Sequence, residues 1–277
     1  MSKKFTLCAF ADEADSTLTG QIAALNENKI SLLEIRGVDG ENISQVLKSK
    51  AKKIKKQIDE SNIKVWSIGS PAGKIKFNDD FTSHLDEFKH MLELADILGA
   101  SRFRLFSFYG YTGGTAARDC VFDRLARFAA AAEGSGVTLC HENEKDIYGE
   151  TADACLDIHK NIPSIKAVFD PANFVQAGQD PWDAWKKLCS YVDYIHIKDA
   201  LKNGQVVPAG QGDGYIPEIL AACENSSGRV LTLEPHLSEF VGLSALENGQ
   251  TMKRMQSYPS QRAAFDVAVN ALKNLIK

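Results

Sequence analysis

The fold is decided by the stretch between residues 137 and 170, which begins Val137-Thr-Leu-Cys-His-Glu142 and ends Ile165-Lys-Ala-Val-Phe-Asp170. Both segments are short runs rich in apolar and β-branched residues, so each predicts a buried strand. The amphipathic segment Ala152–Lys160 between them predicts a helix. A strand, a helix and a second strand in this order are typical of a parallel sheet with helices packed outside it.

The same alternation continues in both directions along the chain. Eight strand–helix units in 277 residues favour a closed (β/α)8 TIM barrel, which needs about 250 residues and leaves no exposed sheet edge. We therefore expect one α/β barrel domain over residues 1–277. The expected strands are Phe5–Phe10, Leu32–Arg36, Lys64–Ser70, Arg102–Phe108, Val137–Glu142, Ile165–Asp170, Val192–Lys198 and Arg229–Glu234. The expected helices are Leu18–Asn28, Ser44–Asp59, Asp79–Leu98, Ala116–Glu133, Ala152–Lys160, Pro181–Cys189, Ile216–Cys223 and Ser260–Ile276.

Composition narrows the class of partner. The formal net charge of −4 argues against DNA or RNA, because nucleic-acid binding depends on a basic face. No apolar run approaches the ~18 residues of a membrane span, and the run Phe5–Ala11 is too short for a signal peptide. The six cysteines form no C-x-x-C pair, which indicates reduced thiols. We expect a cytoplasmic protein that binds a small molecule.

The last four predicted strands all end in residues that bind metals. Glu142, Asp170 and Glu234 each end a strand, and His196 lies near the end of Val192–Lys198. The carboxyl ends of barrel strands converge on one mouth, where active sites of this fold lie. Three carboxylates at close range require a cation between them. Mn²⁺ is the ion we expect first, with Mg²⁺, Co²⁺ or Zn²⁺ as alternatives.

Each of these residues also has a purely structural interpretation. Asp170 followed by Pro171 is the pattern of a helix cap with proline at the first helical position. A histidine inside an apolar run, such as His196, can be a core residue that is fully hydrogen-bonded. Four such residues on consecutive strands favour the metal site.

With these residues in view, the sequence resembles the xylose isomerase-like TIM-barrel superfamily over its whole length. This sugar phosphate isomerase/epimerase group includes tagatose epimerases, hydroxypyruvate isomerase and inosose dehydratase. The resemblance rests on five motifs of the second half of the chain. They are His-Glu-Asn around Glu142, Phe-Asp-Pro-Ala-Asn-Phe with Asp170 and Asn173, Ile-His-Ile-Lys-Asp around His196, Pro208-Ala-Gly-Gln-Gly-Asp213, and Leu-Glu-Pro-His around Glu234.

The resemblance implies one divalent metal ion held by Glu142, Asp170, His196 and Glu234. It also implies that Glu142 and Glu234 are the acid–base pair of a sugar or sugar phosphate isomerase or epimerase. One glutamate would remove a proton next to a carbonyl and the other would return it, while the metal stabilises the enediolate. The resemblance further implies a homodimer or homotetramer.

The sequence departs from the epimerase pattern at three positions that contact substrate hydroxyls in the family. Tyr148 stands where a glutamate is expected, Asn173 where a histidine is expected, and Lys202 where an arginine is expected. A dehydratase or lyase acting on a keto-sugar, keto-inositol or keto-glycoside is therefore the alternative. A non-catalytic sugar-binding barrel is a further alternative. A three-metal endonuclease is disfavoured, because it needs more histidines at the strand ends.

Other residues near the predicted mouth are candidates for binding substrate. They are Lys198, Asn173, His236, Arg36 and Ser70. Strand alternation places Lys198 beside His196 and His236 beside Glu234, whereas His141 faces away from Glu142. Arg36 and Glu34 are expected either to pair with each other or to bind substrate.

Two loops remain. The glycines of Gly210-Gln-Gly-Asp213 predict a close approach of the backbone below the metal, with a plain turn as the alternative. The segment Pro235–Pro259 is the longest without predicted structure, and loops of that length are commonly functional.

Overall fold

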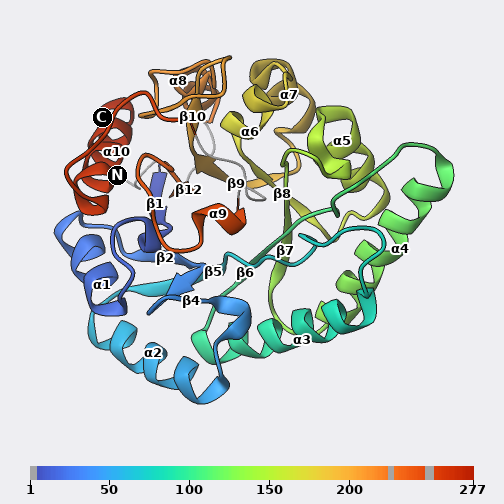
Figure 1. The fold of residues 1–277 in the computed structure, drawn as a ribbon, viewed down its shortest axis with the longest axis horizontal. Helices are drawn as coiled ribbons and strands as arrows, with labels where there is room; N and C mark the ends of the chain where they lie inside the picture. Colours follow the sequence, from blue (N-terminus) through green and yellow to red (C-terminus); the bar gives the residue numbers. More distant parts are fainter. Residues whose placement is uncertain (1–4, 224–227, 247–252) are drawn as a thin grey trace.

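The computed structural model describes residues 5–223, 228–246 and 253–277. Eight parallel strands form a closed barrel in which neighbours in space are neighbours in sequence (Figure 1). This confirms the predicted TIM barrel. The strands are β1 (Phe5–Ala9), β2 (Leu32–Ile35), β5 (Lys64–Ile68), β6 (Arg102–Leu105), β7 (Thr138–Glu142), β8 (Lys166–Phe169), β9 (Val192–Ile197) and β12 (Arg229–Leu233).

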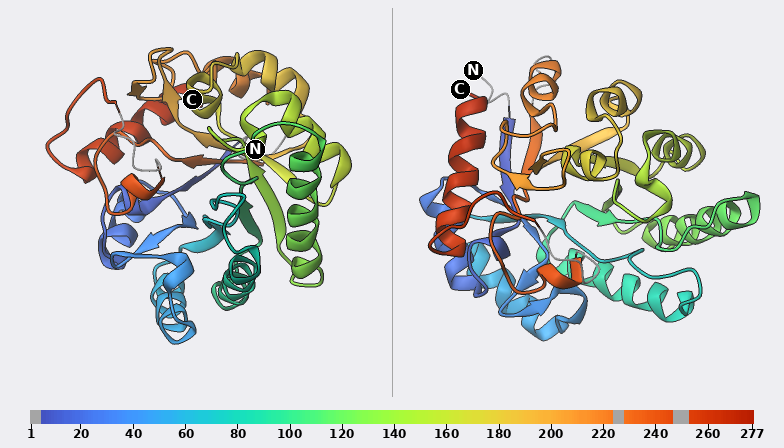
Figure 2. Two further views of the ribbon diagram at one scale, coloured as in Figure 1. Left: turned by 45° about the vertical axis from the view of Figure 1, so that its right-hand side comes forward. Right: turned by 45° about the horizontal axis from the view of Figure 1, so that its top comes forward.

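Helices surround the strands on the outside, as Figure 2 shows from two sides. They are α1 (Leu18–Glu27), α2 (Lys48–Glu60), α3 (Phe81–Leu98), α4 (Thr115–Ala132), α5 (Ala152–Asn161), α6 (Pro171–Gln176), α7 (Pro181–Leu188), α8 (Ile216–Ala222), α9 (Leu243–Leu246) and α10 (Gln261–Leu275). Side chains cap the N-termini of three of these helices: Thr17, Asp80 and Thr151 accept backbone N–H groups of α1, α3 and α5. No helix of the described residues is long and apolar enough to cross a membrane.

The helix expected over Ser44–Asp59 is wrong in its first turn. Residues Ile43–Gln45 form a short 3₁₀ turn, which begins at Asn42 because the Asn42 side chain accepts the backbone N–H of Ser44. Val46 is then extended, and α2 starts only at Lys48. The prediction also missed α6, α9 and two small hairpins. These hairpins are β3 (Gly37–Val38) with β4 (Glu41–Asn42), and β10 (Asp199–Ala200) with β11 (Val206–Val207).

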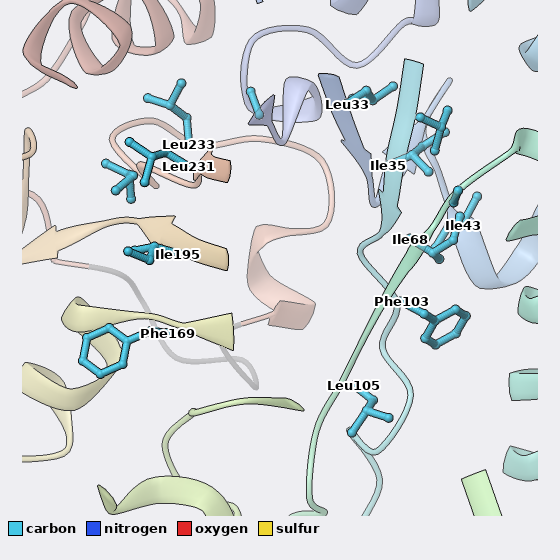
Figure 3. Close-up of a cluster of buried hydrophobic side chains, with 14 of the residues drawn as sticks. Leu33, Ile35, Ile43, Ile68, Phe103, Leu105, Phe169, Ile195, Leu231 and Leu233 are labelled. Atoms are coloured by element: carbon cyan, nitrogen blue, oxygen red, sulfur yellow. The ribbon is translucent and has the colours of Figure 1, made fainter. Parts of the chain in front are cut away.

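The barrel strands alternate between two environments. One set of side chains packs outward against the helices, as Phe103 does on Phe88 of α3 and Phe169 on Trp185 of α7. Figure 3 shows part of this outer apolar layer. The other set points into the barrel and forms a much smaller apolar cluster of Cys8, Cys140, Val168, Tyr194 and Val230. The inward positions nearer the mouth carry polar and charged side chains.

Candidate metal centre

The four predicted ligands converge. Glu142 ends β7, Asp170 follows β8, His196 lies on β9, and Glu234 follows β12. One ligand atom from each of the four lies within 4.8 Å of the other three, and all four side chains are buried. The expected convergence of strand ends therefore places two glutamates, one aspartate and one histidine in a group that can hold a metal ion.

The imidazole of His196 lies at the centre of this group. His196 Nδ1 lies 3.1 Å from Glu142 Oε1 and 2.9 Å from Glu234 Oε2. Asp170 has two roles, because its Oδ1 accepts the backbone N–H of Asn173 as the cap of α6 while its Oδ2 makes no hydrogen bond. The helix-cap interpretation and the metal-ligand interpretation of Asp170 are thus compatible, one oxygen serving each.

Two buried arginines contact the oxygens of Glu142 and Glu234 that do not face His196. Arg104 Nη1 lies 3.2 Å from Glu142 Oε2 and 3.5 Å from Glu234 Oε1. Arg36 Nη1 lies 2.8 Å from Glu234 Oε1. Each glutamate therefore has one oxygen on an arginine and the other facing His196. Sequence reasoning missed Arg104, although an arginine between two outward apolar residues of a barrel strand signals an inward charge.

Arg36 is fixed by acidic residues that follow β1. Its guanidinium donates to both oxygens of Asp12, at 2.9 and 3.0 Å, and lies 3.2 Å from Glu13 Oε1. The alternative in which Arg36 pairs with Glu34 is wrong. Glu34 instead accepts the hydroxyl of Tyr194 at 2.7 Å, deeper in the barrel. Arg36, which directly follows β2, extends toward the mouth, whereas Glu34 of β2 extends toward the inner cluster, although strand alternation predicts the same side for both.

The other substrate-binding candidates differ in position. Lys198 Nζ lies 3.1 Å from Asp170 Oδ2, and Asn173 Nδ2 donates to Glu142 Oε1 at 3.3 Å. His236 Nε2 lies 3.6 Å from Glu234 Oε1. The Ser70 hydroxyl, by contrast, donates to the Arg104 carbonyl and accepts the N–H of Ala72. Lys198, Asn173, His236 and Arg36 therefore border the metal group, whereas Ser70 is hydrogen-bonded to the backbone of β6 and of its own loop.

One further predicted orientation, that of His141, and one departure from the family pattern, Tyr148, can be compared with the structure. His141 faces away from Glu142, as expected: its Nε2 lies 2.9 Å from Ser107 Oγ and its ring packs on His159 of α5. Tyr148, which replaces the family glutamate, donates its hydroxyl to Asp157 of α5. That contact turns the phenol toward the outer helices, so Tyr148 does not replace the glutamate's function in the mouth.

The glycine loop approaches Asp199 rather than the metal group. The backbone N–H groups of Gly210, Gly212 and Gly214 donate to the Asp199 carboxylate at 2.8 to 3.0 Å. A Cβ atom on Gly212 would lie 2.3 Å from Asp199 Oδ1, so only glycine permits this approach. The loop therefore anchors the residue that directly follows Lys198.

The electrostatics of the site indicate an excess of buried negative charge. Burial opposes protonation of His196, but Glu142, Glu234 and Glu34 together raise its pKa well above the usual value. Burial raises the pKa of Asp170 to about 6 against the opposing effect of Lys198. In both cases the protein without a metal retains protons to reduce the charge of the carboxylates. A divalent cation would serve the same purpose and displace those protons.

The donor set fits a divalent ion that prefers oxygen. Among the described residues, Asp170 Oδ2 and Glu234 Oε2 are buried and make no hydrogen bond, and they lie beside Lys198 and His196 respectively. Three carboxylates with one imidazole suit Mn²⁺ or Mg²⁺ and are compatible with Zn²⁺.

A second group of possible ligands consists of Glu13, Glu234 and His236. Arg36 already lies 3.2 Å from Glu13 Oε1 and 2.8 Å from Glu234 Oε1. Because the guanidinium offsets the charge of these two carboxylates, this second group has less need of a cation than the first. The geometry favours one metal ion.

The mouth is covered by the segment that follows β12. In Figure 1 this orange-red segment, with α9, crosses in front of the ring of strands. The Phe240 ring lies 5.5 Å from that of His236 and 4.8 Å from the Arg36 guanidinium carbon. Leu237 and Leu243 are also buried. The expectation of a functional loop at 235–259 therefore falls on a segment that contacts site residues, and its residues 247–252 lie outside the described part of the chain.

Comparison with known proteins identifies the class. The family profile described as xylose isomerase-like TIM barrel matches residues 23–252, which is most of the chain. The chain therefore belongs to the xylose isomerase-like TIM-barrel family. The resemblance recognised from the strand-end motifs is confirmed. No curated protein matches the chain in sequence.

Solved structures share the fold at low sequence identity. An L-ribulose 3-epimerase is 20% identical with a TM-score of 0.74, covering 100% of this chain and 95% of that one. The IOLI protein with a bound zinc atom is 17% identical, with a TM-score of 0.74 and 98% coverage of both chains. A probable 3-DHS dehydratase, AsbF of Bacillus anthracis, is 14% identical, with a TM-score of 0.73 and 98% coverage of both. Isomerising and dehydrating enzymes thus share this architecture.

Proposed function

We propose that the protein is a divalent-metal-dependent isomerase or epimerase of a sugar or sugar phosphate. The observation that carries the proposal is the paired arrangement of Glu142 and Glu234. Each glutamate directs one oxygen to His196 and the other to a buried arginine. Two carboxylates that come from β7 and β12, the two ends of the row of four ligand strands, suit proton removal and return at a single substrate carbon.

Glu142, Asp170, His196 and Glu234 would hold the ion, and Mn²⁺ is our first choice. When bound, a divalent ion stabilises the negative charge that develops on the oxygens of an enediolate. One glutamate removes the proton next to the carbonyl. The other returns a proton to the opposite face of that carbon, giving epimerisation, or to the neighbouring carbon, giving isomerisation.

Residues around the metal group would orient the substrate. Lys198 and Asn173 lie beside ligand oxygens and can donate hydrogen bonds to substrate hydroxyls. Phe240 and the segment around it would exclude water from the reaction once substrate is bound. We expect the enzyme to act in the cytoplasm, as a homodimer or homotetramer.

Elimination is the second candidate reaction, and Lys198 favours it. This lysine is buried, and Asp170 outweighs the effect of burial to raise its pKa well above the usual value, so it carries a proton in the mouth. One glutamate would remove the proton next to the carbonyl, and the bond to the β-hydroxyl would break. A proton from Lys198 would let that hydroxyl leave as water.

The test is proton exchange in heavy water. The Mn²⁺-loaded protein would be incubated with ketoses, aldoses and keto-inositols, and the products followed by NMR. We expect deuterium next to the carbonyl together with an isomer of the substrate. Glu142→Gln should lower the rate by about 10²–10⁴-fold, the usual value of a positioned acid or base. Glu150→Gln, whose carboxylate accepts the backbone N–H of Asp146, is the control.

The outcomes separate the candidates. An unsaturated product without an isomer would establish the elimination in place of isomerisation. Undiminished exchange in both Glu142→Gln and Glu234→Gln would contradict the acid–base pair. Sugar binding without exchange or elimination would identify a binding protein.

A further inference from the structure

One buried carboxylate of the barrel interior has no place in the metal group. Glu34 lies on β2 and is fully buried. It is not one of the four residues whose ligand atoms converge. An ionised carboxylate in such a place is costly unless several donors satisfy it, so its contacts should reveal its role.

Three donors surround Glu34. Its Oε1 accepts the hydroxyl of Tyr194 at 2.7 Å and that of Ser67 at 3.1 Å. Its Oε2 lies 3.3 Å from His196 Nε2. The Ser67 contact depends on an irregularity of the sheet, because the register between β2 and β5 shifts by one residue at this point. Such bulges re-aim side chains.

This contact fixes the position of a hydrogen atom on His196. A carboxylate only accepts hydrogen bonds, so the nitrogen facing Glu34 must carry hydrogen. In a neutral imidazole the other nitrogen is then the one with the free lone pair. That nitrogen, Nδ1, is the one facing the oxygens of Glu142 and Glu234.

We propose that Glu34 is a positioning residue, which holds His196 with hydrogen on Nε2 and leaves Nδ1 to bind the metal ion. The proposal rests on the metal centre of the proposed function but not on the reaction it performs. Glu34 acts through His196 and does not touch the ion. Tyr194 and Ser67 in turn hold the carboxylate in place.

The contact between Glu34 and His196 would strengthen metal binding in two ways. Without an acceptor below Nε2, the imidazole can adopt the tautomer with hydrogen on Nδ1, which cannot bind the ion through that atom. The negative charge of Glu34 also makes Nδ1 a stronger ligand. Partners of this kind typically change metal affinity by about 10- to 100-fold.

The first experiment is a Co²⁺ titration of the full-length chain, followed by visible absorption and by competition with a chelator. Glu34→Gln should weaken Co²⁺ binding about 10- to 100-fold and alter the absorption spectrum. Tyr194→Phe removes one donor to Glu34 and should have a smaller effect in the same direction. Glu144→Gln is the matched control, since it removes a buried carboxylate that pairs with Lys74 and not with His196. Its Co²⁺ affinity should stay close to that of the wild type.

The second experiment needs no variant. NMR of the Zn²⁺-loaded wild-type protein with ¹⁵N-labelled histidine should show the ring hydrogen of His196 on Nε2. A hydrogen on Nδ1, or a Glu34→Gln protein that binds Co²⁺ as tightly as the wild type, would overturn the positioning role and leave the metal centre standing. A wild-type protein that binds no Co²⁺ would overturn both.

Discussion

The two halves of the barrel mouth differ in what they contribute. The half formed by β7, β8, β9 and β12 supplies every residue of the four-ligand group. The half formed by β1, β2 and β6 supplies Arg36, Arg104 and the acidic residues that hold Arg36. One half thus offers the proposed ligands, and the other contacts the glutamate oxygens that do not face His196. We therefore predict that substitutions in the ligand half mainly weaken metal binding, whereas the stability cost of substitutions in the other half changes when metal is bound.

The largest effect is expected in the ligand half, for Asp170→Ala. The change removes a ligand and also the cap of α6, because Oδ1 accepts the N–H of Asn173. We expect Mn²⁺ affinity to fall by more than ~100-fold, since effects of that size follow even from the loss of a ligand's partner. The lost cap should lower the free energy of unfolding by about 1 kcal/mol, and the loss of the buried partner of Lys198 should lower it further. Calorimetry with Mn²⁺ and urea unfolding measure the two effects.

Asp170→Asn separates the two roles, because asparagine also caps helices well. It should restore the contribution of the cap to stability, while Lys198 still lacks its carboxylate partner and the ion stays weakly bound. Tight Mn²⁺ binding by either variant would remove Asp170 from the ligand set.

A substitution in the other half should cost the most stability when the metal is absent. Arg104→Met leaves Glu142 and Glu234 without one of their buried cations. We expect the metal-free protein to lose about 3–5 kcal/mol of unfolding free energy, as when one partner of a buried pair is removed. With Mn²⁺ bound the loss should be smaller, because the ion neutralises the same carboxylates. Urea unfolding with and without Mn²⁺ measures both values.

Arg118→Met is the matched control for that comparison. Arg118 pairs with Asp157 on the outer surface, where solvent screens the ion pair and its contribution to stability is small. The unfolding free energy lost in Arg118→Met should be the same with and without Mn²⁺. Equal losses for Arg104→Met with and without metal would show that Arg104 has no link to the ligand group.

The smallest effect concerns pH. The raised pKa values of Asp170 (about 6) and His196 mean that the folded, metal-free protein binds protons more tightly than the unfolded chain. Stability therefore falls as pH rises through these values. Metal binding should show the opposite trend, strengthening from pH 5 to 8 as the competing protons leave. Thermal unfolding over this range, with and without Mn²⁺, should show that the stabilisation by Mn²⁺ grows as pH rises. Parallel slopes would contradict the shared site.

The sequence predicted the ligand half better than the positioning half, and there is a physical reason. Glu142, Asp170 and Glu234 end apolar strands, and barrel topology alone brings such ends together. Glu34 lies in β2 and Arg36 directly follows this strand, two residues later, so periodicity assigns both to the same side. It does not reveal that one side chain extends toward the mouth and the other toward Tyr194.

Other features depended on contacts between distant residues. The inward charge of Arg104 is stabilised by two glutamates far along the chain, and no local pattern encodes that pairing. The break before α2 arises from a local hydrogen bond of Asn42, which competes with helical periodicity. The glycine loop was expected near the metal, yet it encloses Asp199, because sequence indicates close approach without naming the partner.

The central claim is that the mouth holds one divalent ion, and metal stoichiometry tests it most directly. The purified protein would be stripped with chelator, reloaded with Mn²⁺, passed through a desalting column and analysed for its elemental content. We predict one tightly held ion per chain in the wild type and none in Asp170→Ala. A folded wild-type protein that retains no Mn²⁺, Mg²⁺, Co²⁺ or Zn²⁺ would contradict it.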